Sequence, residues 1–386
     1  MSNVAVTGVG LLARGRTTES AAEILSKEFQ HHESFLGNAI PVEEYRKNVV
    51  RLVAREDRSI LNDAAIQCLL TAIDAFALAE EKGPIDGKTR ENIGVFTSAE
   101  REREFPTELW DLVHRREWDQ PPTVSAVLSR IGQLRERVHP LALFKKLPTN
   151  ALYHISKYFQ LRGGGYPIQR MSLGGICMIE EAAAKIADGC LDGAILSACG
   201  NMASLDNHLA FSRMGLLRER DGTSGILPSA AAASILLEPQ QRVQDRGASP
   251  FALLHRASTK FHDKVQVNDA DWLAFYDRYF SDLASKPIFV VCYDNGIEES
   301  GEKERSAVRK FFANPKILSY KKYTGYTGQP NNLVDFILTI ADTSVPIGAS
   351  IILNGIGTSV GMGAVLFEKC RDTIASQAVR GASYGN

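Results

Sequence analysis

Apolar and polar positions along the chain follow two kinds of spacing, and each kind predicts a different element. Short apolar runs bounded by glycine or charged residues indicate buried strands, whereas apolar residues three or four apart indicate amphipathic helices. Runs of the first kind occupy residues 3–7, 92–97, 191–198, 225–238, 251–256, 287–292, 316–319, 350–354 and 363–367. The second spacing occupies residues 59–80, 140–161, 177–188, 269–284, 302–312 and 331–340. This alternation predicts an α/β fold.

The order of these elements repeats along the chain. Residues 1–240 and 250–386 each contain strands and helices in a similar order, with a glycine-rich turn that leads into a helix. A segment at 99–139 interrupts the first half with dense charge and isolated aromatic residues, and we expect a surface excursion there. Residues 239–247 are expected to be a charged linker. The pattern predicts an internally duplicated, layered α/β fold that forms one compact unit.

The stretch Tyr166–Gly200 is the most informative part of the first half. It predicts an extended run, a sharp turn at 172–175, a helix at 177–188 and a strand at 191–198, which together form a βαβ unit. Gly189 supplies the helix stop, because glycine is favoured just after a helix end. The turn presents Ser172 at the start of the helix, which is where α/β enzymes often place a nucleophile.

Composition narrows the functional classes. The chain has 386 residues, of which 44% are hydrophobic and 23% are charged, and its formal net charge is −1. This balance favours neither a nucleic-acid partner nor an anionic membrane surface. The absence of an apolar run of 18 residues excludes a membrane-spanning helix, and we expect a cytoplasmic protein.

The cysteines and the first glycines give no sign of a cofactor. The six cysteines contain no CxxC pair, so we expect buried reduced thiols and no metal site. Gly8 and Gly10 follow the first apolar run, but no third glycine completes a dinucleotide-binding pattern. We therefore expect a tight turn there and no cofactor.

Five segments in order carry a resemblance to a known family. They are VAVTGVG at 4–10, PLALFKKLPTNALYHISKYFQLRGGG at 140–165, the Ser172 turn with its helix, SYKKYTGYTG at 319–328 and NGIGTSVGMGAVLF at 354–367. In this order they resemble the β-ketoacyl synthase family, over nearly the whole chain. The resemblance implies the thiolase fold, a layered αβαβα architecture with mixed sheets.

The departures from the family pattern concern its chemistry. Condensing synthases use a cysteine thiolate to hold the acyl chain and two histidines to assist decarboxylation. By position, the cysteine corresponds to Ser172 and the histidines to Tyr293 and Tyr326, while the family lysine is kept as Lys321. The GDGAG strand has become PSAAAA at 228–233, and a gating phenylalanine has become Thr358. The resemblance therefore implies a catalytically degenerate member.

The first hypothesis is a chain length factor of a type II polyketide synthase. The resemblance implies that such a subunit pairs with a Cys-bearing ketosynthase, shapes the tunnel for the growing chain and meets an acyl carrier protein transiently. The partner is expected along residues 168–174, and the interface candidates are Ile168, Gln169, Arg170 and Met171. Large apolar residues in the charged excursion are candidates for setting chain length, and these are Phe105, Leu109, Trp110 and Leu112.

The second hypothesis is a serine-dependent ketosynthase-like acyltransferase with Ser172 as the acyl acceptor. A serine hydroxyl needs a base, and tyrosines with an ordinary pKa of about 10 are neutral donors at pH 7. Lys321 could act as a base only if burial lowered its pKa by several units. His154 is the histidine nearest to Ser172 in sequence, and we expect it to be a core or surface residue.

Overall fold

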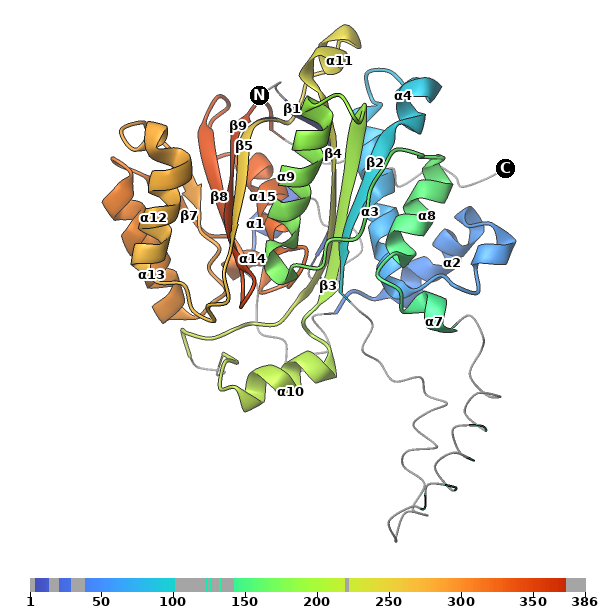
Figure 1. Ribbon diagram of the computed structural model, residues 1–386, viewed down its shortest axis with the longest axis horizontal. Coiled ribbons are helices and arrows are strands. Elements are labelled where there is room, and N and C mark those ends of the chain that lie inside the picture. The colour runs from blue at the N-terminus through green and yellow to red at the C-terminus, as the bar shows by residue number, and fades with distance from the viewer. Residues whose placement is uncertain are drawn as a thin grey trace.

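A mixed sheet of nine strands forms the centre of the molecule (Figure 1). The computed structural model describes residues 4–13, 21–28, 39–100, 142–218 and 222–372, with a few isolated positions between 123 and 132. The strand order is β2-β3-β4-β1-β5-β9-β8-β6-β7. The strands are β1 (Val4–Ala13), β2 (Ile93–Ala99), β3 (Gly193–Asn201), β4 (Ala230–Pro239), β5 (Ala252–Phe261), β6 (Phe289–Val291), β7 (Lys316–Leu318), β8 (Ser350–Gly357) and β9 (Gly361–Lys369).

The sheet contains one arrangement twice. In the first half β2 and β3 are parallel, and β4 and β1 continue the sheet antiparallel. In the second half β6 and β8 are parallel, and β9 and β5 continue the sheet antiparallel, with β7 added at the edge. Three residue pairs join β1 to β5. The repeated order confirms the duplicated α/β architecture.

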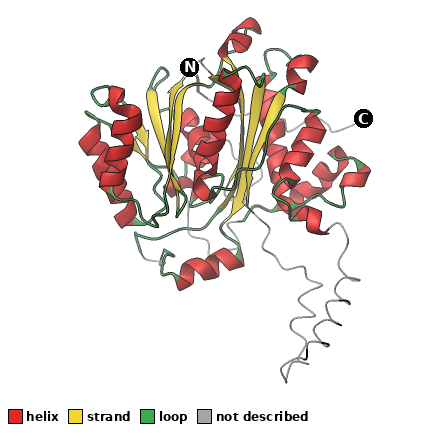
Figure 2. Ribbon diagram, in the orientation of Figure 1, coloured by secondary structure: helices red, strands yellow, loops and turns green. Residues whose placement is uncertain are grey.

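Helices form layers on both faces and between the two halves (Figures 1 and 2). The helices are α1 (Ala21–Leu25), α2 (Val42–Leu52), α3 (Asp63–Ala79), α4 (Gly87–Glu91), α7 (Ala142–Lys145), α8 (Asn150–Phe159), α9 (Gly174–Ala187), α10 (Leu205–Arg213), α11 (Gln240–Asp245), α12 (Asp269–Phe280), α13 (Glu298–Phe311), α14 (Lys321–Thr324) and α15 (Asn331–Ala341). Helix α3 packs on β1, β3 and β4, while α9 and α15 contact strands of both halves. Helices α12 and α13 cover the second half on its outer side.

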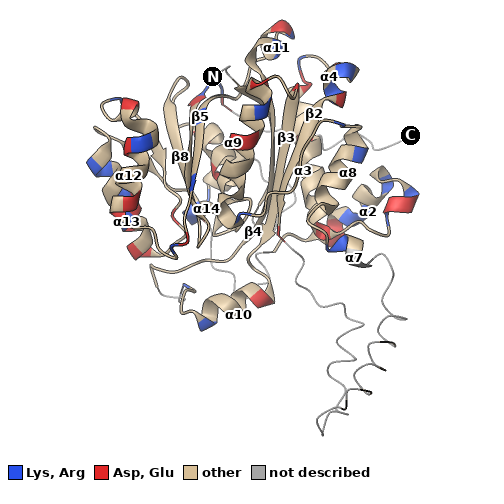
Figure 3. Cartoon of the chain, in the orientation of Figure 1, with Lys and Arg blue, Asp and Glu red and all other residues tan. Residues whose placement is uncertain are grey.

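Three apolar cores fill the spaces between these layers. The central core surrounds α9 and α15 and includes Leu173, Ile176 and Phe336. A second core lies between α3 and the first half of the sheet, and a third lies under α12 and α13 around Trp272. Charged side chains of both signs lie on the outer helices, whereas the central strands carry few (Figure 3). The charge pattern therefore follows the layers.

The first glycines do not form the expected turn. Strand β1 continues through Gly8 and Gly10 to Ala13. A Cβ atom on Gly8 would lie 1.9 Å from the carbonyl oxygen of Ala75, and one on Gly10 would lie 2.0 Å from that of Thr71. These glycines are needed because α3 lies directly on the strand, and only a residue without a side chain leaves that space.

Three further expectations differ from the structure. The expected linker at 239–247 contains α11, which the buried Val243 anchors to the fold. The expected helix at 140–161 is divided into α7 and α8, with Pro148 between them, because proline lacks the amide hydrogen that a helix interior requires. The strand expected at 225–238 begins only at Ala230, since Pro228 pairs with Tyr326 in an isolated bridge instead.

Candidate functional site

Ser172 lies in a single turn of 3-10 helix, Met171–Leu173, immediately before α9. The backbone of Met171 has a φ of 49°, which is a left-handed conformation that a residue with a side chain adopts rarely. Gly174 and Gly175 follow without room for larger residues, since their Cβ atoms would lie 2.2 Å from Ser98 and 2.9 Å from Asn332. The sharp turn predicted from the sequence is therefore present.

The structure brings together three of the predicted site residues, Ser172, Tyr293 and Tyr326. The Ser172 hydroxyl lies 2.9 Å from the Tyr293 hydroxyl, and the Tyr326 hydroxyl lies 3.4 Å from both oxygens. Ser172 also donates to the carbonyl oxygen of Ile356 at 2.6 Å. Because a serine hydroxyl has one proton, Tyr293 is the donor in its bond with Ser172.

Two members of this hydroxyl cluster, Ser172 and Tyr293, are closed to solvent, whereas Tyr326 is half-buried. Ser172 is 1% exposed and Tyr293 is 3% exposed, so the serine is buried at the turn and not presented at an open tip. Burial raises the pKa of Tyr293 well above its ordinary value, and the nearby Tyr326 adds to this effect. Tyr293 therefore stays protonated, and the cluster offers hydrogen-bond donors but no base to Ser172.

Glu304 of α13 fixes the backbone that carries Tyr293. Its Oε1 accepts hydrogen bonds from the Tyr293 amide at 2.9 Å and from Nδ2 of Asn354 at 2.7 Å, and its Oε2 accepts from the Asp294 amide at 3.4 Å. Burial raises the pKa of Glu304 to about 7. The sequence analysis predicted a helix at 302–312 but did not single out Glu304, which lies on the same buried face as Ala307 and Val308.

Lys321 forms a buried ion pair below the cluster. Its ammonium group contacts Oδ2 of Asp335 in α15, and Lys321 and Asp335 are 7% and 1% exposed. Burial raises the pKa of Asp335 to about 6, against the lowering effect of the Lys321 charge. Lys321 is thus held by a carboxylate, and no hydrogen bond joins it to Ser172 among the residues that the structure describes.

His154 belongs to another part of the molecule. It lies in α8 and is 2% exposed, close to a cluster in which Asp57 accepts from Tyr153 at 2.7 Å and pairs with Lys157 at 2.5 Å. Burial lowers the pKa of His154 to about 4, so the imidazole is neutral. It is a core histidine and does not contact the hydroxyl cluster.

The four interface candidates differ in exposure. Ile168 is buried, and Gln169 turns inward, where its side chain donates to the Ala99 carbonyl at 3.1 Å and accepts from Gln329 at 3.0 Å. Met171 is 55% exposed, and the exposed Arg170 stacks 4.9 Å from the ring centroid of Phe261. Only Arg170 and Met171 of this set have side chains available to a partner.

The remaining candidate residues are not among those that form the hydroxyl cluster. Thr358, at the expected gating position, is exposed in the turn between β8 and β9. The chain-length candidates lie outside the described residues, and these are Phe105, Leu109, Trp110 and Leu112.

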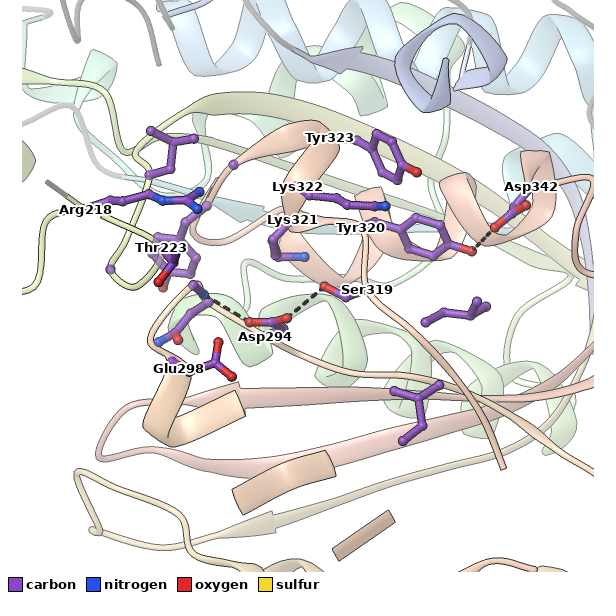
Figure 4. A pocket seen from close by; sticks show the side chains of 18 of the residues that line it. Arg218, Thr223, Asp294, Glu298, Ser319, Tyr320, Lys321, Lys322, Tyr323 and Asp342 are labelled. Atoms are coloured by element: carbon purple, nitrogen blue, oxygen red, sulfur yellow. Dashed lines mark hydrogen bonds between the residues drawn. The ribbon is translucent and has the colours of Figure 1, made fainter. Parts of the chain in front are cut away.

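A polar pocket of about 510 Å³ opens beside the cluster (Figure 4). Its wall includes Lys321 and Tyr326 but neither Ser172 nor Tyr293. The loops that follow β6 and β7 form much of the wall, at the carboxyl ends of parallel strands. Sequence reasoning missed this pocket, because its residues come from four separate segments with no shared motif.

The described residues contain neither a metal site nor a membrane-spanning helix. In those ranges the structure has no group of three or more His, Cys, Asp or Glu side chains arranged to hold a metal ion. The described helices are also all too short or too polar to span a bilayer. The cysteines Cys68, Cys177, Cys199 and Cys292 are buried and free, while Cys190 is exposed and free.

Comparison with known proteins gives a clear result for structure but not for sequence. No family model matches the chain, and no curated protein matches its sequence. The ishigamide ketosynthase/chain length factor superposes with a TM-score of 0.70 at 15% identity, over 96% of this chain and 99% of that chain.

Two further solved structures are similar. One is a chain of the AntDE:AntF complex, a type II polyketide synthase acyl-carrier protein with its ketosynthase bound to the hexaketide, with a TM-score of 0.69 at 13% identity over 95% of this chain and 99% of that chain. The other is the ketosynthase from module 6 of the bacillaene synthase of Bacillus subtilis 168, with a TM-score of 0.72 at 10% identity over 96% and 72%. The chain therefore has the thiolase fold of ketosynthases.

Proposed function

We propose that this chain is a chain length factor, a non-condensing ketosynthase-like subunit of a type II polyketide synthase. It pairs with a Cys-bearing ketosynthase and shapes the tunnel in which a chain bound to an acyl carrier protein grows. The observation that carries the proposal is the hydroxyl cluster. The only proton of Ser172 is bonded to the Ile356 carbonyl, and tyrosines occupy both positions where the resemblance expects histidine.

The neighbours in structure support the pairing. Two of the similar structures bear the names of a ketosynthase/chain length factor and of a type II ketosynthase with its acyl-carrier protein. This chain retains that fold but lacks a thiol at the turn before α9, where Ser172 lies. A subunit that keeps the fold and has lost the nucleophile is suited to shape a tunnel instead of holding an acyl chain.

The test is to follow the acyl group. The chain is co-expressed with a Cys-bearing ketosynthase and incubated with an acyl thioester of the acyl carrier protein, and intact masses of both subunits are measured. We expect acylation of the partner's cysteine and none on this chain. Ser172→Ala should leave product formation by the heterodimer within about twofold, because Ser172 forms no bond to substrate.

A second variant separates loss of folding from loss of chemistry. Ser172→Cys restores a thiol of similar size, and we expect it to stay unmodified because the position is 1% exposed. An acyl adduct that forms on the unsubstituted chain and is absent from Ser172→Ala would overturn the proposal. That outcome would establish the serine-dependent acyltransferase in its place.

A further inference from the structure

The pocket beside Lys321 has the features of a small-molecule site in its own right. Its volume of about 510 Å³ falls within the range of roughly 300 to 1,000 Å³ that small-molecule sites occupy. It lies where β6 and β7 end, and open α/β sheets bind ligands outside the carboxyl ends of their parallel strands. It borders the hydroxyl cluster through Tyr326, while the buried Ser172 and Tyr293 take no part in its wall.

The acidic side chains in the wall are already neutralised or hydrogen-bonded. Asp294 accepts from Ser319 at 3.0 Å and lies 3.6 Å from Arg305, which also pairs with Glu298 at 2.6 Å. Asp342 accepts from the Tyr320 hydroxyl at 3.0 Å. Each of these carboxylates is therefore held by a hydrogen bond or an ion pair within the protein, and each keeps part of its acceptor capacity.

The basic side chains in the wall keep free donors. Nε of Arg218 donates to the Gly222 carbonyl at 2.8 Å, but its two terminal nitrogens have no protein partner among the described residues. Lys322 is 55% exposed, and its ammonium lies 3.7 Å from Glu28 and 4.7 Å from the ring centroid of Tyr323. Figure 4 shows Arg218 at one end of the pocket and Lys322 between that end and Tyr320. Arg218 and Lys322 therefore bring positive charge and open donors to the wall.

Aromatic rings complete the wall. Tyr320, Tyr323 and Tyr326 all line the pocket, but Tyr320 is only 2% exposed, so the rings open to a ligand are those of Tyr323 and Tyr326. Tyr326 is held against Phe211 with ring centroids 6.2 Å apart. A guanidinium group with two open nitrogens matches the geometry of a carboxylate or phosphate, and tyrosine faces accept flat apolar groups.

We propose that this pocket binds a small ligand that has an anionic head, phosphate or carboxylate, and an apolar or aromatic body. Arg218 binds the head, Lys322 adds a second positive charge, and the two open tyrosine rings contact the body. The inference stands on the pocket alone and does not depend on the role proposed for the chain in polyketide synthesis.

The test uses three probes of similar shape on the full chain. Phenyl phosphate, benzoate and uncharged benzamide are titrated by calorimetry, with inorganic phosphate as a competitor. We expect saturable binding of at least one of the two anions and none of benzamide. Binding by phenyl phosphate that inorganic phosphate displaces identifies a phosphate head, whereas preference for benzoate identifies a carboxylate.

Two variants locate the site. Arg218→Gln should weaken binding of the preferred anion at least tenfold, because it removes the charge and the paired donors. Arg213→Gln is the matched control, since Arg213 is exposed at the end of α10 and does not line the pocket. The proposal would be overturned if Arg218→Gln bound the anion as tightly as the unsubstituted chain does. It would also be overturned if benzamide bound as tightly as the anions.

Lysine acetylation gives a readout on the folded chain without substitution. Lys322 and Lys310 have side chains that are both 55% exposed, but only Lys322 lines the pocket. The bound anion should slow acetylation of Lys322 and leave Lys310 unchanged. Equal rates at Lys322 with and without a saturating anion would also contradict the assignment.

Discussion

Glu304 is the residue on which Tyr293 depends for its position. The carboxyl group accepts hydrogen bonds from two backbone amides and from Asn354, and Asn354 donates in addition to the Tyr276 hydroxyl at 2.7 Å. Burial of this group without a cation in contact favours its neutral form, which explains the raised pKa. The position of Tyr293 in the hydroxyl cluster therefore depends on Glu304, whose pKa lies close to neutral pH.

The stability of the fold should respond to this titration. The pKa of Glu304 is about 7 in the folded chain and about 4.3 in an unfolded one, so between these values the folded state holds a proton that the unfolded state has released. The free energy of unfolding therefore falls as pH rises, by about 4 kcal/mol in total from this group. Glu304→Gln removes that contribution.

Denaturant titrations from pH 4.5 to 7 measure the effect. The difference in free energy of unfolding, Glu304→Gln minus the unsubstituted chain, should rise by about 3 kcal/mol from pH 4.5 to pH 7. This rise is expected whatever the difference between the two chains at pH 4.5. Glu302→Gln is the control, because Glu302 is on the same helix but exposed. Parallel curves for Glu304→Gln and the unsubstituted chain would show that Glu304 is ionised in the fold.

At the scale of elements, the contact between β1 and α3 leaves no room for side chains at two positions of the strand. The carbonyl oxygens of Thr71 and Ala75 occupy the places where side chains of Gly10 and Gly8 would lie. Packed interiors cannot absorb such an overlap without a backbone shift. A single methyl group here is therefore expected to separate the helix from the strand.

Gly8→Ala should lower the free energy of unfolding by about 3 kcal/mol or more, because its Cβ would overlap a backbone atom. Gly87→Ala is the matched control, since its added Cβ meets nothing within 4 Å and it lies in α4. Alanine is favoured over glycine in helices by about 1 kcal/mol, so this control should be neutral or stabilising. Thermal and denaturant unfolding of both variants measure the difference, and equal behaviour would refute the tight packing.

The elements also show what the sequence could and could not predict. Periodicity placed most strands and helices within a few residues, because apolar spacing reflects which face is buried. It failed at Gly8 and Gly10, where glycine normally signals a turn but here serves a helix from another part of the chain. It also missed α11, whose six residues contain only Val243 as a buried anchor.

The site was predictable in part for a similar reason. The family motifs indicated Ser172, Tyr293 and Tyr326, and the structure places their hydroxyl groups together. Glu304 and Asp335 escaped notice because their partners are distant in sequence, and Arg218 because the other segments of its pocket are. A pattern along the chain contains no information on whether a carboxylate is exposed or buried against a backbone amide.

At the scale of the whole molecule, the edge of the sheet at β2 is the expected meeting place with a partner. Strand β2 is the outermost strand in the first half, and Thr97 pairs with Pro167 beside it. The neighbouring surface includes the exposed Met171 and Phe261, which is 57% exposed. Exposed large apolar side chains of this kind are typical of interaction surfaces.

Met171→Asp should weaken the proposed heterodimer at least tenfold, because a carboxylate would be buried in the interface. The folded chain should tolerate aspartate, which adopts a positive φ more readily than most residues. Met214→Asp is the control, since Met214 is 65% exposed and lies after α10, away from this edge. Co-purification with the ketosynthase measures the effect, and equal retention of both variants would exclude Met171 from the interface.

Helices α9 and α15 each contact strands from both halves of the chain, and this has a consequence for synthesis on the ribosome. Helix α9 contacts β5 and β9, which are made later, and α15 contacts β1 and β4, which are made earlier. When the first 240 residues have emerged, the face of α9 that will meet β5 and β9 has nothing to cover it. The nascent chain must therefore carry an exposed apolar helix through translation of more than a hundred residues. Chaperone demand should consequently peak just before β9 is completed.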